Sequence, residues 1–108
     1  MSLPSDMQAM SEAEDIHSLQ QAIVAALKAG ARFATAHKEG GSHIVWTGSR
    51  FLREDYGDFP DRIIYADEAA FLAALRRFFD WQVSRDCYPG KPTEVEAWRG
   101  ILNLLYRD

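Results

Sequence analysis

Two histidines, His37 and His43, flank the segment Lys38-Glu39-Gly40-Gly41-Ser42. Histidine is the commonest metal ligand in proteins and the usual general base near neutral pH. A two-residue Gly40-Gly41 loop would place the two side chains on opposite faces of a hairpin, whereas a three-residue loop centred on Gly40 would place them on one face. A metal site needs further ligands, and the sequence contains no CxxC or HExxH motif. We therefore predict a hairpin tip decorated with polar residues and no metal or cofactor.

Glu54 is the carboxylate best placed to act with these histidines. In the predicted strand register it lies opposite His43, where the two side chains could form an acid–base couple or an ordinary surface ion pair. No serine lies in a G-x-S-x-G motif. Cys87 lies near an expected helix C-terminus, where the helix dipole disfavours a thiolate. A small enzyme or metal site that uses His37, His43 and Glu54 is therefore kept only as an alternative.

The segment Tyr56-Gly57-Asp58-Phe59-Pro60 places two aromatic residues in a polar loop. Loops on a rigid scaffold often carry binding function, and tyrosine is enriched at the cores of protein interfaces. Two interpretations stay open, because Phe59 could either pack under the loop against the core or face a partner. In the second case the loop and the hairpin tip form one binding surface. Its candidate residues are His37, Lys38, His43, Arg50, Arg53, Glu54, Asp55, Tyr56, Asp58 and Phe59.

The elements that position these residues begin with a helix over about 12–29. Ser11-Glu12-Ala13-Glu14 has the pattern of a capping box, an apolar stripe follows at helical spacing, and Gly30 supplies the residue that ends the helix. The pattern then changes to the alternation typical of strands. Four strands are predicted, over Arg32–Lys38, His43–Thr47, Arg50–Tyr56 and Arg62–Tyr65.

Turn positions set the predicted register of the sheet. A Gly40-Gly41 loop pairs Glu39 with Ser42 and puts His37 opposite Ile44, and a Gly48-Ser49 loop pairs Trp46 with Phe51. One face then carries Phe33, Ile44, Trp46 and Phe51, which we predict as the core. The other face is small and mixed, so it is either partly covered or a contact surface. Its residues are Ala34, Ala36, Val45 and Leu52, flanked by His43, Glu54 and Tyr56.

Two further helices complete the predicted fold. Asp67 caps the first, whose apolar band over residues 69–79 continues through Trp81 and Val83 and ends at the Tyr88–Pro92 run. A capping box over residues 93–96 opens the second, whose apolar surplus predicts a homodimer or a tighter intramolecular fit. The predicted fold class is α+β, with a three- to four-stranded antiparallel meander packed against helices in the order α-β-β-β-β-α-α.

Length and charge narrow the class of protein. The 108 residues suffice for one domain, assigned to residues 11–108, with residues 1–10 as a flexible N-terminal arm. A net charge of −4 argues against nucleic-acid binding. The sequence has one cysteine, no secretory signal and no long apolar stretch, which predicts a cytoplasmic protein without membrane association.

Together these features favour a small cytoplasmic protein-binding or regulatory domain without an assignable catalytic activity. An inhibitor or immunity-type protein, whose partner is another protein, falls within this class. The enzyme or metal site with His37, His43 and Glu54 is the alternative. A homo-oligomeric structural subunit, dimeric through the C-terminal helix, is a further one.

Overall fold

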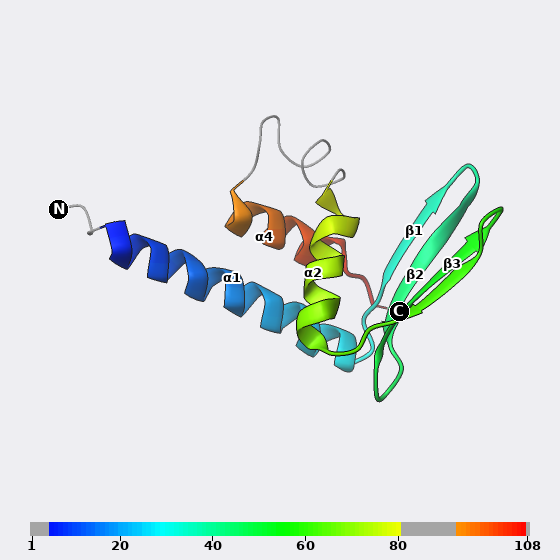
Figure 1. Ribbon diagram of the computed structural model, residues 1–108, viewed down its shortest axis with the longest axis horizontal. Coiled ribbons are helices and arrows are strands. Elements are labelled where there is room, and N and C mark those ends of the chain that lie inside the picture. The colour runs from blue at the N-terminus through cyan, green and yellow to red at the C-terminus, as the bar shows by residue number, and fades with distance from the viewer. Residues whose placement is uncertain (1–4, 81–92, 108) are drawn as a thin grey trace.

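The computed structural model describes the backbone of residues 5–80 and 93–107, and within these ranges the side chains of residues 11–36, 38–80 and 93–107 (Figure 1). The strands form one antiparallel sheet in the order β1-β2-β3-β4, so the predicted α+β meander and its element order α-β-β-β-β-α-α are confirmed. The elements are α1 (Ser5–Lys28), β1 (Phe33–His37), β2 (Gly40–Trp46), β3 (Phe51–Gly57), β4 (Asp61–Ile64), α2 (Glu68–Phe78) and α4 (Glu94–Leu104).

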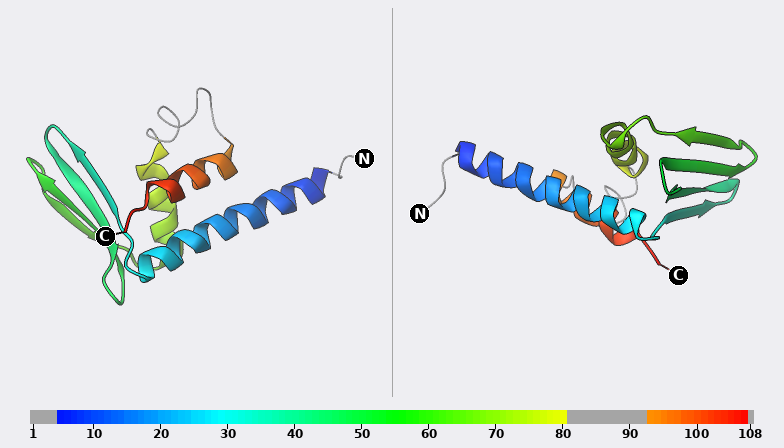
Figure 2. Two further views of the ribbon diagram at one scale, coloured as in Figure 1. Left: turned by 180° about the vertical axis from the view of Figure 1, so that it is seen from behind. Right: turned by 90° about the horizontal axis from the view of Figure 1, so that it is seen from below.

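The three described helices lie on the same side of the sheet (Figures 1 and 2). α1 and α4 run side by side, and α2 crosses them and packs against the sheet. The N-terminal part of α1 extends well beyond α2 and α4 in both figures. The opposite face of the sheet carries no described helix. The fold is therefore a two-layer arrangement with one open sheet face.

α1 begins earlier than the sequence predicts. It starts at Ser5, so Ser11 lies inside the helix and the predicted capping box at Ser11 is wrong. The preceding run is rich in Met, Gln and Ala, which favour helix, and this explains the earlier start. Its end is as predicted: Gly30, with φ +106°, donates its N–H to Leu27 (3.1 Å), and the N–H of Ala31 bonds the carbonyl of Ala26 (2.9 Å). These two bonds are those of a Schellman motif.

The predicted core face of the sheet is confirmed. Phe33, Ile44 and Phe51 are buried beneath the helices, and Trp46 is partly buried beside them. The ring of Phe51 stacks on that of Phe71 in α2 with centroids 4.1 Å apart. The helices contribute the rest of the buried cluster, which consists of Ile23, Val24, Leu27, Leu72, Leu75, Phe79, Ala97, Trp98 and Ile101.

The register of the first hairpin differs from the prediction. His37 pairs with Gly40 and Phe33 with Ile44, so the turn is Lys38-Glu39 rather than Gly40-Gly41. No described non-glycine residue has positive φ, so Lys38 and Glu39 do not form a primed turn; instead Gly40, directly after them, takes φ +152°. The turn lies two residues earlier than predicted, so each residue of β1 pairs four positions away from its predicted partner. Since side chains alternate with period two, the predicted division of the sheet into two faces is unchanged.

The second turn follows the prediction. Trp46 pairs with Phe51 and His43 with Glu54, and Gly48 takes φ +105°. The hydroxyl of Thr47 accepts from the backbone N–H groups of Ser49 (3.3 Å) and Arg50 (3.1 Å), which holds this turn. β4 then pairs with β3 at Asp61–Ile64, one residue earlier than predicted at each end.

Both predicted caps after the sheet are present. The carboxylate of Asp67 accepts from the N–H of Ala70 (2.7 Å), and Thr93 and Glu96 form a reciprocal capping box. α2 ends at Phe78 with Phe79 as its C-cap, so the prediction that this helix continues to the Tyr88–Pro92 run is wrong. Trp81, Val83 and the Tyr88–Pro92 run lie outside the described residues. The apolar surplus of α4 is used within the chain, because Leu102, Leu104 and Leu105 pack against the core. Homodimerisation through α4 stays a prediction.

No helix among the described residues is long and apolar enough to cross a membrane.

Candidate functional site

Two aromatic side chains at one end of the sheet face solvent, Tyr56 near the end of β3 and Phe59 in the turn between β3 and β4. Phe59 is 85% exposed and Tyr56 is 53% exposed. The interpretation in which Phe59 packs under the loop against the core is therefore wrong. Large exposed aromatic side chains are typical of protein-binding surfaces. We call the two turns at this end of the sheet, with Lys38, Glu39, Tyr56, Asp58 and Phe59, the tip surface.

Three glycines bring the two turns of the tip surface together. Gly40 pairs with Gly57, and a Cβ at either position would overlap backbone atoms of the other turn. The N–H of Asp58 donates to the carbonyl of Glu39 (3.1 Å) across the same contact. At Gly41 a Cβ would meet the ring of Tyr56, which therefore lies over this glycine. The backbone that carries Phe59 is thus fixed by contacts to the neighbouring hairpin.

A groove of about 260 Å³, the tip groove, adjoins the tip surface on the helix side of the sheet. The guanidinium of Arg53 donates two hydrogen bonds to Asp55, Nε to Oδ1 (2.9 Å) and Nη2 to Oδ2 (2.8 Å), and Ser42 donates its hydroxyl to the same Oδ1 (2.7 Å). The guanidinium also lies over the ring of Phe78, 4.6 Å from its centroid. The groove is lined by Thr35, Glu39, Gly41, Ser42, Arg53, Asp55, Tyr56, Phe59 and Phe78.

This network makes a rigid wall rather than a reactive site. The hydrogen bond that Arg53 donates to Asp55 raises the pKa of Arg53, partly opposed by desolvation, so the guanidinium stays charged at any accessible pH. Both charges are engaged with each other, and their two parallel bonds fix the planes of both side chains. Sequence reasoning included Arg53 and Asp55 but missed Ser42 and Phe78. Their contribution depends on the fold, because Phe78 comes from α2.

The remaining predicted residues divide into three places. Lys38 and Asp58 belong to the tip surface. His43 and Glu54 lie on the open face of the sheet, opposite each other in register, but no hydrogen bond or ion pair joins them in the described part of the chain. Arg50 lies at the other end of β3, seven residues of strand away from the tip, or roughly 20 Å. Arg50 therefore does not lie with the other residues of the binding surface predicted from the sequence.

The histidine pair does not meet in the sheet. Ala34, not His37, lies opposite His43, which removes the pairing that a shared metal would need. The side chain of His37 lies outside the described residues. Within the described ranges, no group of three His, Cys, Asp or Glu residues could hold a metal ion. The predicted register of His43 opposite Glu54 is confirmed, and the metal and acid–base alternatives stay predictions.

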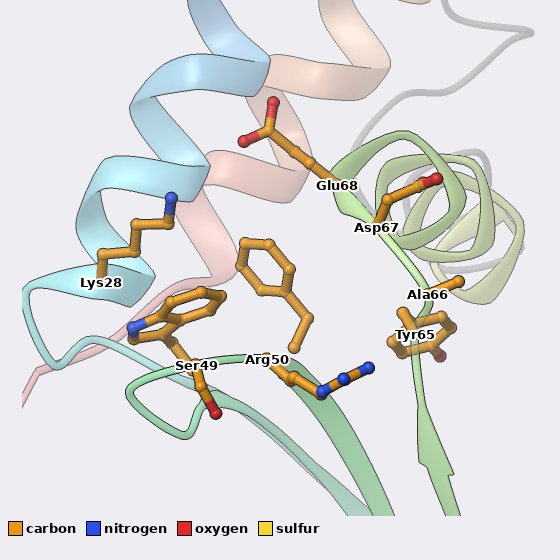
Figure 3. Close-up of a pocket in the computed structure, with 9 residues that line it drawn as sticks. Lys28, Ser49, Arg50, Tyr65, Ala66, Asp67 and Glu68 are labelled. Carbon is orange, nitrogen blue, oxygen red and sulfur yellow. The ribbon is translucent and has the colours of Figure 1, made fainter.

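A second cavity, which sequence reasoning did not find, lies at the far end of the sheet from the tip surface. Figure 3 shows it between Lys28 of α1, Ser49 and Arg50 of the β2–β3 turn, and residues 65–68 at the start of α2. It measures about 450 Å³, and Trp46, Phe51 and Tyr65 form its aromatic wall. We call it the aromatic pocket. The sequence analysis predicted two of its aromatic residues, Trp46 and Phe51, as core, and so it did not indicate a cavity beside them.

Comparison of the chain with models of protein families, with curated proteins and with solved structures gives no match in any of the three.

Proposed function

We propose that this protein is a small protein-binding or regulatory domain that docks another protein through the tip surface. The observation that carries the proposal is the 85% exposure of Phe59 on a turn whose backbone is fixed by the neighbouring hairpin. A large apolar side chain exposed on a rigid support loses little conformational entropy when a partner covers it. Inhibitors and immunity-type proteins are examples of this functional class.

The expected binding energy concentrates in the two aromatic residues. Full burial of a phenylalanine side chain is worth about 2 kcal/mol in transfer free energy. Phe59 is almost fully exposed before binding, so nearly all of that burial is available to a partner. Tyr56 adds an apolar ring with a hydroxyl donor at its edge, a combination that is enriched among residues dominating interface energies. The tip groove beside them offers a recess for a side chain of the partner.

Charge indicates the chemistry of that partner. The tip half of the sheet carries five carboxylates, from Glu39, Glu54, Asp55, Asp58 and Asp61, and three cations, from Lys38, Arg53 and Arg62. Arg53 is engaged with Asp55, which leaves a net negative rim around the two aromatic side chains. A basic partner surface would match this rim, and its association rate would fall as salt rises.

Capture from an extract of the native cell tests the proposal. Wild-type protein, Phe59→Ala, Tyr56→Ala and Ile64→Ala serve as baits, and retained proteins are quantified by mass spectrometry. Ile64 is the matched control, because it is as exposed as Tyr56 (53%) but pairs with Leu52, near the end of β3 that lies away from the tip surface. We expect at least one protein of the extract to be retained by wild type and by Ile64→Ala, and its retained amount to fall about tenfold or more with Phe59→Ala. Equal retention by all four baits would contradict the proposal.

The proposal includes a cytoplasmic location and no nucleic-acid partner, and it rests for both on the single cysteine and the net charge of −4. Light scattering tests the competing homodimer. A monomer at high micromolar concentration removes it, whereas a dimer that persists in Phe59→Ala assigns the association to α4 or another surface.

A further inference from the structure

The aromatic pocket has the size and the lining of a small-molecule site. Its volume of about 450 Å³ falls within the range typical of ligand pockets, about 300–1,000 Å³. Phe51 is held by its stack on Phe71 and by a tilted contact with Trp46 at 4.8 Å, and Tyr65 meets Phe71 edge-on at 5.4 Å. The aromatic wall is therefore set by the core, and it is present before any ligand binds.

The charged residues at the pocket differ in whether they already have a hydrogen-bond or ion-pair partner in the protein. Both carboxylates accept hydrogen bonds: Asp67 from the N–H of Ala70 (2.7 Å) and Glu68 from the side chain of Gln21 (3.1 Å). Neither cation has a carboxylate within ion-pair distance in the described part of the chain. Lys28 instead places its Nζ over the ring of Trp46, 4.8 Å from the centroid, and the side chain of Arg50 makes no described hydrogen bond.

The two charged groups at the pocket that have no carboxylate partner among the described residues are therefore both exposed cations. Lys28 comes from α1 and Arg50 from the β2–β3 turn, and the two lie at different edges of the pocket (Figure 3). The start of α2 forms a third side, and the positive end of its dipole also favours negative charge. Asp67 and Glu68 oppose this preference, so the anion must sit on the side of Lys28 and Arg50.

We propose that the aromatic pocket binds a small planar aromatic carboxylate. The flat ring packs against the wall formed by Trp46, Phe51 and Tyr65. The carboxylate accepts charge-assisted hydrogen bonds from Lys28 and Arg50, the two donors without a carboxylate partner. This site is separate from the tip surface, since Arg50 and the tip lie at opposite ends of β3.

Titration with 2-naphthoate, followed by amide NMR spectra of the full chain, tests the proposal. Its neutral isostere 2-naphthamide is titrated in parallel. A ligand of this size is expected to bind with a Kd of roughly 1 mM or tighter. We expect saturable shifts confined to the amides near the lining residues, in segments 27–29, 46–52 and 64–69. Naphthamide should bind about tenfold more weakly, because it lacks the charge that Lys28 and Arg50 recognise.

Variants assign the effect to the two cations. Lys28→Gln combined with Arg50→Gln should weaken naphthoate about tenfold or more and bring it level with naphthamide. Arg62→Gln, an exposed cation on β4, is the matched control and should bind naphthoate as wild type does. Phe59→Ala should also leave binding unchanged, which separates this test from that of the tip surface. Equal affinity for the acid and the amide, unchanged binding by the double variant, or no saturation by about 10 mM would each overturn the proposal.

Discussion

Replacing Gly57 by alanine should destabilise the protein more than the same substitution at Gly48, where the new methyl group would have open space around it. Gly57 takes φ +115°, a backbone conformation that L residues rarely adopt. A Cβ at this position would also overlap the carbonyl oxygen of Glu39 in the neighbouring turn. The substitution therefore combines a conformational cost with a steric one.

The two costs can be separated with a second glycine. Gly48 has nearly the same φ, +105°, but a Cβ there meets nothing within 4 Å. Gly48→Ala should therefore show only the cost of the left-handed conformation, about 1–2 kcal/mol. Gly57→Ala should add an overpacking cost of about 1–3 kcal/mol, because the contacting atom is backbone and cannot rotate away. The total of about 2–5 kcal/mol is a large part of the stability of a small domain.

Urea unfolding followed by circular dichroism measures both changes. With a slope of about 1–3 kcal/mol per M, the extra cost in Gly57→Ala should lower the midpoint by roughly 1 M relative to Gly48→Ala. Amide spectra of Gly57→Ala should show the largest shifts in the two turns of the tip surface. If Gly57→Ala and Gly48→Ala had the same midpoint, the contact between the two turns would not contribute to the fold as argued.

Three further outcomes are expected. Phe71→Ala should cost about 3–5 kcal/mol in urea unfolding, because Phe71 is 1% exposed and supports the ring of Phe51; a cost below 1 kcal/mol would contradict the stacked core. Asp67→Ala should cost about 1 kcal/mol through loss of the α2 cap, and Asp67→Ser should recover most of it; equal loss in both would show that the cap is not the cause. Hydrogen bonds from the backbone N–H of Thr93, and next from its hydroxyl, lower the pKa of Glu96. The ionised Glu96 carboxylate therefore stabilises the fold above the ordinary glutamate pKa, and this stabilisation is lost as pH falls through the lowered pKa. The difference in urea midpoint between wild type and Glu96→Gln should accordingly be larger at pH 6 than near pH 3, and a constant difference would contradict the assignment.

The sequence predicted the fold well where the decisive signal is local. Gly30, Asp67 and Thr93 each end or begin a helix through bonds to residues within five positions, so their patterns sufficed. The core face of the sheet was also predictable, because a register shift of four residues, an even number, leaves each side chain on the same face. The start of α1 was not predictable, because the Ser11–Glu14 pattern can stand inside a helix as well as at its first turn.

The predicted register of the first hairpin was wrong because of contacts with a distant part of the sequence. Gly40 and Gly41 resemble turn residues, yet their absent side chains serve the contacts with Gly57 and Tyr56 on another strand. Nothing within the hairpin distinguishes a glycine needed for its own conformation from one needed for close approach of a neighbour. The observed turn is therefore Lys38-Glu39, although no local pattern favours it over Gly40-Gly41.

The same long-range contact decides the functional interpretation. Whether Phe59 is buried or exposed could not be derived from its own loop, because the direction of that loop depends on Gly57 packing against the Lys38-Glu39 turn. Had Gly40 and Gly41 formed the turn, the two loops would not meet as they do. The exposure of Phe59 thus follows from a glycine pair seventeen residues apart in sequence, Gly40 and Gly57. For this reason Gly57→Ala should impair partner capture as well as stability, although it leaves both aromatic side chains in place.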